Sequence, residues 1–170
     1  TLTGAQTVAG VKTFSDKPIF SAGPGAGNTN QSCVRVHTAN GYGSSSTKIR
    51  RFTTASINQG TDITYADSAT LGASFTINAS GVYGISYSDD FAGSADVVGI
   101  SLNTTTPATA IQSIAAAEKL AMSTTANINY SSTTTIAVYL PAGSVVRAHT
   151  STAQAAGTIA AAQFTITRLS

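Results

Sequence analysis

The chain has 170 residues and a net charge of +2, and only 9% of its residues are charged, against roughly a quarter in an ordinary globular domain. So weak a charge argues against nucleic-acid binding, which needs clustered Lys and Arg. The single cysteine excludes an intrachain disulfide. No apolar run approaches the roughly 18 residues of a membrane span, so we expect no membrane insertion.

Residues 2–20 contain strand-forming residues that Gly4, Gly10 and Pro18 divide into pieces too short for a stable sheet. We expect such pieces to pair with identical copies from other chains. The segment resembles the TGxQTVxGxKTF-type segment of bacteriophage tail-fibre shafts, and the resemblance implies an intertwined β shaft. The matching residues are Thr3, Gly4, Gln6, Thr7, Val8, Gly10, Lys12, Thr13 and Phe14.

Residues 21–30, SAGPGAGNTN, are small, polar and Gly-rich, which is typical of a connector. We therefore divide the chain into a shaft segment with its linker, 1–30, and a head domain, 31–170. Because the chain begins with Thr1 rather than Met, we expect it to be the end of a longer protein.

From Gln31 onward, short strand-like runs alternate with Gly, Asn, Asp and Ser clusters, which is typical of a sandwich or jelly roll. The predicted strands fall within 32–38, 47–53, 62–66, 73–79, 81–91, 95–103, 133–141, 144–150 and 162–169. In one of them, period-2 alternation places Tyr83, Ile85 and Tyr87 on one face. Residues 107–122 are Ala-rich and leave two alternatives, an irregular strand or one short helix.

Phe75 and the run Gly81–Tyr87 match the F-x5-G-x-Y-x-F-x-Y signature of complement globular-head and TNF-like jelly rolls, with Ile85 in place of the usual Phe. The sequence LPAGSVV resembles a later turn of that family, with Ser144 in place of an Asp, while Ser68 departs from the pattern. The stretch from 34 to 91 also resembles C-terminal domains of phage tail proteins. These resemblances imply an all-β chain: a short intertwined shaft followed by a TNF-like antiparallel jelly-roll sandwich, assembled as a homotrimer.

The chain contains few groups suited to catalysis and none of the common catalytic motifs, so we predict no enzymatic activity and assign no catalytic residue, cofactor or metal. Asp89, Asp90 and Asp96 form the single acidic cluster. A solvated loop is the favoured interpretation of this cluster, and a calcium site remains an alternative.

Two short sequences, Val34–Thr38 and Val146–Thr150, place His37 and His149 in matching contexts. We expect both histidines on strand surfaces, with a three-imidazole metal site on a trimer axis as the alternative. The basic cluster Lys48, Arg50 and Arg51 is interpreted as the solvated face of a strand.

The sequence thus predicts a virion tail-fibre tip that acts outside the cell and binds a bacterial surface glycan or outer-membrane protein for host attachment. Counting strand reversals places four loops at the end away from the shaft. The expected receptor-binding residues in these loops are Tyr42, Asp89, Asp90, Asn127 and Gln154. Two other functions stay open: a structural trimerisation cap or tail-needle knob that binds no receptor, and, with less support, a polysaccharide depolymerase.

Overall fold

The computed structural model describes residues 31–45, 48–124 and 131–170, so the expected shaft, the connector and Asn127 lie outside the described residues. Ten β-strands and three single-turn 3₁₀ helices make up the described chain. The strands are β1 (Cys33–Tyr42), β2 (Arg50–Gln59), β3 (Ile63–Ser68), β4 (Gly72–Ile77), β5 (Gly81–Asp89), β6 (Val97–Leu102), β7 (Lys119–Thr124), β8 (Ser132–Leu140), β9 (Val145–Thr150) and β10 (Gln163–Arg168). The 3₁₀ helices are η1 (Ile111–Ser113), η2 (Ala116–Glu118) and η3 (Ile159–Ala161). No helix within these ranges is long and apolar enough to cross a membrane.

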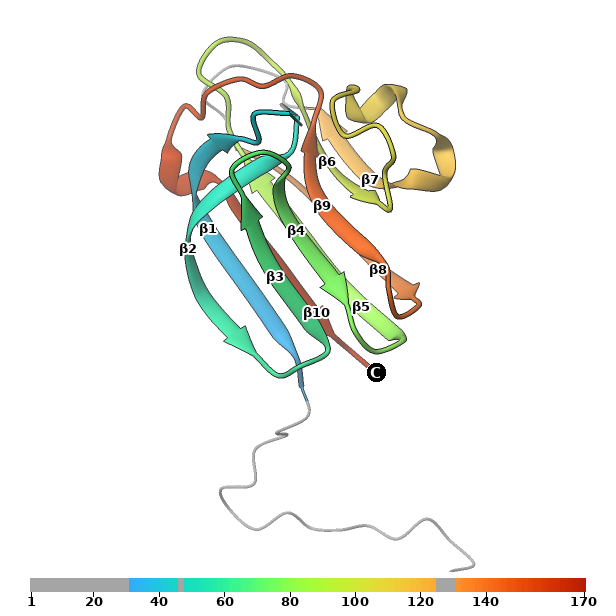
Figure 1. Ribbon diagram of the computed structural model, residues 1–170. Coiled ribbons are helices and arrows are strands. Elements are labelled where there is room, and N and C mark those ends of the chain that lie inside the picture. Colours follow the sequence, from blue (N-terminus) through green and yellow to red (C-terminus); the bar gives the residue numbers. More distant parts are fainter. Residues whose placement is uncertain (1–30, 46–47, 125–130) are drawn as a thin grey trace, which may run out of the picture.

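Two five-stranded antiparallel sheets pack against each other (Figure 1). The first sheet has the strand order β2-β1-β10-β5-β8 and the second has the order β3-β4-β9-β6-β7. Three of the four neighbouring pairs in the first sheet and two of the four in the second are distant in the sequence, which is the connectivity of a jelly roll rather than of a simple meander. The predicted all-β sandwich is therefore confirmed.

Several strands follow the alternation of the sequence, but β1 and β2 run beyond their predicted ends at residues 38 and 53, and most of β2 is exposed on both faces. Tyr83, Ile85 and Tyr87 of β5 are buried, whereas Val82, Gly84 and Ser86 face outward, as period-2 alternation predicts. The undecided segment 107–122 contains both kinds of structure. Its first part forms η1 and η2, and β7 begins at Lys119 and pairs with β6.

Aromatic rings from both sheets meet in the core. Phe75 of β4 stacks on Phe164 of β10, with ring centroids 4.3 Å apart, and Tyr87 of β5 lies 5.9 Å from Phe164. Phe75 and Tyr87 are the first and last residues of the jelly-roll signature. That signature therefore marks the contact at which the two sheets are held together, because each aromatic pair adds about 0.5–1.5 kcal/mol to the free energy of burial.

The sandwich has two distinct ends. Cys33 pairs with Thr167, so the start of the described chain and its C-terminus lie together at what we call the terminal end. The opposite, distal end holds the described parts of the β1–β2 loop (43–45 and 48–49), the β5–β6 loop (90–96) and the β9–β10 loop (151–162), since Ser88 pairs with Gln163 and Val98 with Thr150. Figure 1 shows these loops at the top and the C-terminus at the bottom.

Candidate functional site

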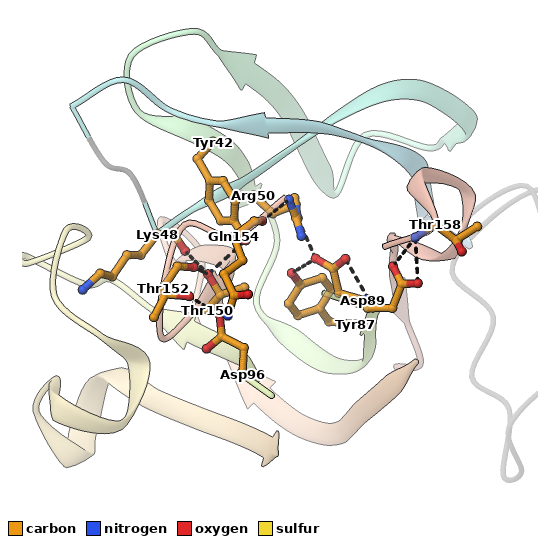
Figure 2. Close-up of polar contacts among 11 residues, drawn as sticks. Tyr42, Lys48, Arg50, Tyr87, Asp89, Asp96, Thr150, Thr152, Gln154 and Thr158 are labelled. Atoms are coloured by element: carbon orange, nitrogen blue, oxygen red, sulfur yellow. Dashed lines mark hydrogen bonds and ion pairs between the residues drawn. The ribbon is translucent and has the colours of Figure 1, made fainter. Parts of the chain in front are cut away.

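Of the five expected receptor-binding residues, the structure brings four together at the distal end. Tyr42 ends β1, Asp89 ends β5, Asp90 follows it, and Gln154 lies in the β9–β10 loop. These positions agree with the count of strand reversals. Their exposure does not agree with expectation, however, because these side chains are buried or half-buried. They contact other groups of the protein, among them Arg50, Tyr87 and Thr150 (Figure 2).

Asp89 was expected in an exposed loop, and this expectation is wrong. Its side chain is completely buried and accepts hydrogen bonds from Arg50 Nε at 2.6 Å and from the Tyr87 hydroxyl at 2.6 Å. The physical reason is the alternation of β5, which continues through Tyr83, Ile85 and Tyr87 to Asp89 and so turns this carboxylate inward. Burial raises the pKa of Asp89, and the charge of Arg50 opposes that rise.

Arg50 lies beneath the distal loops rather than on a solvated basic face. Its side chain is fully buried, and its guanidinium lies over the ring of Tyr42, 4.4 Å from the centroid. Nη1 donates to the carbonyl oxygen of Gln154 at 3.3 Å. The neighbouring Arg51 points outward and pairs with Asp67 at 2.9 Å, so alternation along β2 divides the two arginines between the interior and the surface.

Tyr42 was expected to be a receptor-binding residue, but its side chain is half-buried. Its ring packs beneath the Arg50 guanidinium, and its hydroxyl accepts a hydrogen bond from Thr150 Oγ1 at 3.4 Å. Burial raises the pKa of this tyrosine well above its ordinary value. Tyr139 of β8 is far more open, with 62% of its surface exposed, and it lies on the first sheet rather than in the distal loops.

Asp90 and Gln154 join the β5–β6 loop to the β9–β10 loop. Both carboxylate oxygens of the buried Asp90 accept from the backbone N–H of Thr158, at 3.0 and 2.8 Å. Gln154 Oε1 accepts from the backbone N–H of Ser94 at 2.9 Å, and Nε2 donates to Asp96 at 3.4 Å. These two side chains therefore stabilise the loops instead of projecting from them.

The acidic cluster is not the solvated loop that was favoured. Asp96 is 3% exposed, and its carboxylate accepts hydrogen bonds from the hydroxyls of Ser151 and Thr152. Asp89 and Asp90 are likewise engaged by donors from the protein. Within the described ranges, no group of three or more His, Cys, Asp or Glu side chains is placed to hold a metal ion.

The two histidines have different environments despite their matching sequence contexts. His149 is completely buried, and its Nε2 lies 2.7 Å from the carbonyl oxygen of Thr109, in the segment before η1. Burial lowers its pKa to about 4. The surface position expected for His149 is therefore wrong, and a side chain enclosed within its own chain cannot meet copies on a trimer axis. His37 of β1 is half-exposed and lies 2.8 Å from Thr38 Oγ1.

Apart from Ile159, whose larger side chain is also exposed, small hydroxyl and methyl groups form the described outer surface of the distal end. Sequence reasoning selected the larger polar side chains there, which are the ones that turn inward. The exposed residues are Ser44, Ser45, Ala92, Gly93, Ser94, Ala95, Thr152, Ala153, Ala155, Gly157, Thr158, Ile159 and Ala160. The sequence did contain one signal for these exposed residues. They occupy the loops that the count of strand reversals placed at the distal end.

The strand order and the packing of the two sheets define the TNF-like jelly roll. Among solved structures, the crystal structure of murine APRIL at pH 8.5 superposes with a TM-score of 0.55 and 11% identity, covering 82% of this chain and 100% of that chain. The structures of murine APRIL at pH 8.0 and pH 5.0 each give a TM-score of 0.56 over the same shares, with 11% and 10% identity. At such identities the similarity is one of fold. No protein-family model and no curated protein sequence matches the chain.

Proposed function

We propose that the chain is the tip of a bacteriophage tail fibre, a virion component that attaches to a receptor on the bacterial surface. The observation that carries the proposal is the separation of the two ends of the sandwich. The described chain begins beside its own C-terminus, so a shaft preceding Cys33 joins the head at the terminal end. The distal loops then face away from the virion, toward the cell.

The proposal includes a homotrimer that forms through the outer face of the first sheet. This face has a shallow depression whose lining includes the small residues Gly84, Ser86 and Ala137. Two large apolar side chains stand beside it, Tyr139 at 62% and Leu169 at 57% exposure. Small residues allow close approach of another subunit. Covering exposed apolar groups at an interface lowers the free energy and so favours association.

The distal surface supports a receptor with many hydroxyl groups, such as a surface glycan, because its outward groups are hydroxyls and methyls. Single contacts of this kind are weak. Three linked copies raise the overall affinity by roughly 10²–10⁴ over one site. An outer-membrane protein remains the other candidate receptor.

Two other functions have less support. A depolymerase needs a pair of carboxylates free to act on a sugar, whereas Asp89, Asp90 and Asp96 are each held by donors from the protein. A structural cap or tail-needle knob needs the trimer face but does not need ordered distal loops. The extensive polar contacts that order these loops favour the receptor-binding function over the cap.

Adsorption of the purified protein to a panel of bacterial strains tests the proposal, with competition against a surface-polysaccharide extract to separate glycan from protein receptors. Ala153→Arg places a long side chain on the distal surface, and Ala142→Arg places the same side chain in the β8–β9 turn at the terminal end; both alanines are exposed. We expect the first variant to lose adsorption and the second to retain it. Adsorption by neither the parent protein nor the control would favour the cap, and equal adsorption by both variants would move the site away from the distal loops.

A further inference from the structure

We infer that Arg50 is a positioning residue for the receptor-binding surface: its buried guanidinium holds the distal loops in one arrangement before any receptor arrives. The inference rests on the proposed function and deepens it. We call the side chains of Arg50, Asp89, Tyr87 and Tyr42, together with the carbonyl of Gln154, the Arg50 cluster.

The first argument is that the cluster joins separate segments of the chain. Arg50 begins β2, and its Nε donates to Asp89 at the end of β5. Its Nη1 reaches Gln154 O in the β9–β10 loop, and the plane of the guanidinium covers the ring of Tyr42 at the end of β1. A planar cation with several donors suits such a junction, because it can serve partners in different directions at once.

The second argument concerns what else could order these loops. The β5–β6 and β9–β10 loops consist largely of Ala, Gly, Ser and Thr, and Phe91 is a rare large apolar side chain among them. Their contacts with each other are polar, such as the backbone N–H of Ala92 donating to Ala155 O at 3.1 Å. Apolar burial is therefore small here, and the arrangement depends on directed hydrogen bonds and on the ion pair.

The third argument is the free-energy cost of the site. Arg50 and Asp89 are both fully removed from water, and Arg50 Nη2 has no hydrogen-bond partner among the described residues. An apolar pair of similar volume often serves stability as well as or better than a buried ion pair. Burying both charges costs desolvation free energy. A requirement for one defined geometry of the surface above the pair explains why the pair is present.

Hydrogen exchange of the intact protein, followed by mass spectrometry, tests the positioning role without a receptor. The variant Arg50→Met with Asp89→Asn removes both charges and keeps similar volumes. We expect amides of residues 90–96 and 151–158 to exchange at least about tenfold faster. Arg50→Lys keeps the charge beside Asp89 but cannot serve Asp89 and the Gln154 carbonyl from one planar group, so its exchange should be intermediate. If the double variant does not fold, the exchange of the Arg50→Lys variant still tests the inference.

The matched control is Arg168→Met with Asp62→Asn, which removes the Arg168–Asp62 pair at the terminal end, where Nη1 lies 2.9 Å from the carboxylate. This control should leave exchange in the distal loops unchanged. Unchanged exchange in the Arg50 variants would overturn the inference.

Adsorption to the host strain that binds the parent protein connects the loops to the receptor. We expect the Arg50 double variant to bind at least about tenfold more weakly while the Arg168 control binds normally. Faster exchange with normal adsorption would overturn the assignment of the receptor to these loops. A parent protein that adsorbs to no strain would count against the proposed function, while the exchange data would still decide whether Arg50 positions the loops.

Discussion

The rings of Phe75 and Phe164 stack across the two sheets at a centroid distance of 4.3 Å and an interplanar angle of 16°. Phe75 belongs to β4 of the second sheet and Phe164 to β10 of the first, and both side chains are completely buried. Tyr65 and Tyr87 extend this aromatic contact on either side, at 5.2 Å from Phe75 and 5.9 Å from Phe164. The sandwich is thus joined at its centre by rings from both layers.

Replacing Phe164 by Ala should lower the free energy of unfolding by about 3–5 kcal/mol, because it leaves a cavity between the sheets and removes two ring contacts. Chemical denaturation at fixed protein concentration measures this change. Ile159→Ala is the control, since Ile159 is 59% exposed, and it should change stability by no more than about 0.5 kcal/mol. Equal effects of the two substitutions would contradict the placement of Phe164 in the core.

Asp89→Ala should cost about 3–5 kcal/mol, because it leaves the buried Arg50 guanidinium without its carboxylate partner. Asp67→Ala removes a carboxylate from a partly exposed pair with Arg51 and should cost less than about 1 kcal/mol. Thermal and chemical denaturation of both variants provide the measurement. Because Asp89→Ala is expected to destabilise the fold, a loss of adsorption in this variant would not show that Asp89 contacts the receptor. A small effect at Asp89 would mean that Arg50 is not enclosed as described.

Stability should decrease as the pH falls from about 6.5 toward 4, and His149 should account for much of the decrease. Burial lowers the pKa of His149 from its ordinary value of 6.5 to about 4 in the folded chain. The unfolded chain therefore takes up the proton first as the pH falls, and the folded state loses up to roughly 3 kcal/mol of relative stability over this interval. Lys48 and Arg147 add to the lowering of the pKa, whereas Glu118 and the Thr109 carbonyl oppose it.

His149→Gln tests this pH dependence, because an amide can still donate to the Thr109 carbonyl but does not titrate. Its stability should change less between pH 7 and pH 4 than that of the parent protein. Both proteins retain Asp89, whose raised pKa acts in the opposite direction at the acid end. The difference between the two curves therefore isolates His149, and parallel curves would refute its role.

The proposed homotrimer should dissociate when a long charged side chain is placed on the outer face of the first sheet. Ala137 is exposed and lines the depression on this face, so Ala137→Arg should yield monomers with a normal melting profile at low concentration. Ala66→Arg, on the exposed edge strand β3 of the second sheet, should remain trimeric. Analytical ultracentrifugation at micromolar concentration distinguishes these states. A parent protein that is monomeric under the same conditions would rule out the trimer altogether.

Strand positions were predictable because burial on one face imposes alternation that is visible in β5 and β10. The start of β7 could not be predicted, because Lys119–Thr124 follows an Ala-rich stretch and lacks alternation of its own. Asp89 was misplaced although the period of β5 points it inward, because a carboxylate at a strand end resembles a loop residue until its partner is known. That partner, Arg50, lies 39 residues away, and a pair so distant leaves no local signal. His149 was misplaced for the same reason, since the segment that covers it belongs to a different part of the chain.

The antiparallel pairing of Cys33 with Thr167 has a consequence for how such a head could diversify. The described chain enters the sandwich and ends at the same, terminal end, so in the proposed fibre the distal loops carry no connection to a shaft. Outward residues such as Ser94 and Ala153 can change, and their loops can lengthen, without altering the terminal end at which the proposed fibre joins the head. If the chain is the proposed fibre tip, heads built on this plan are interchangeable between fibres, and exchanging this one domain changes the receptor that is bound.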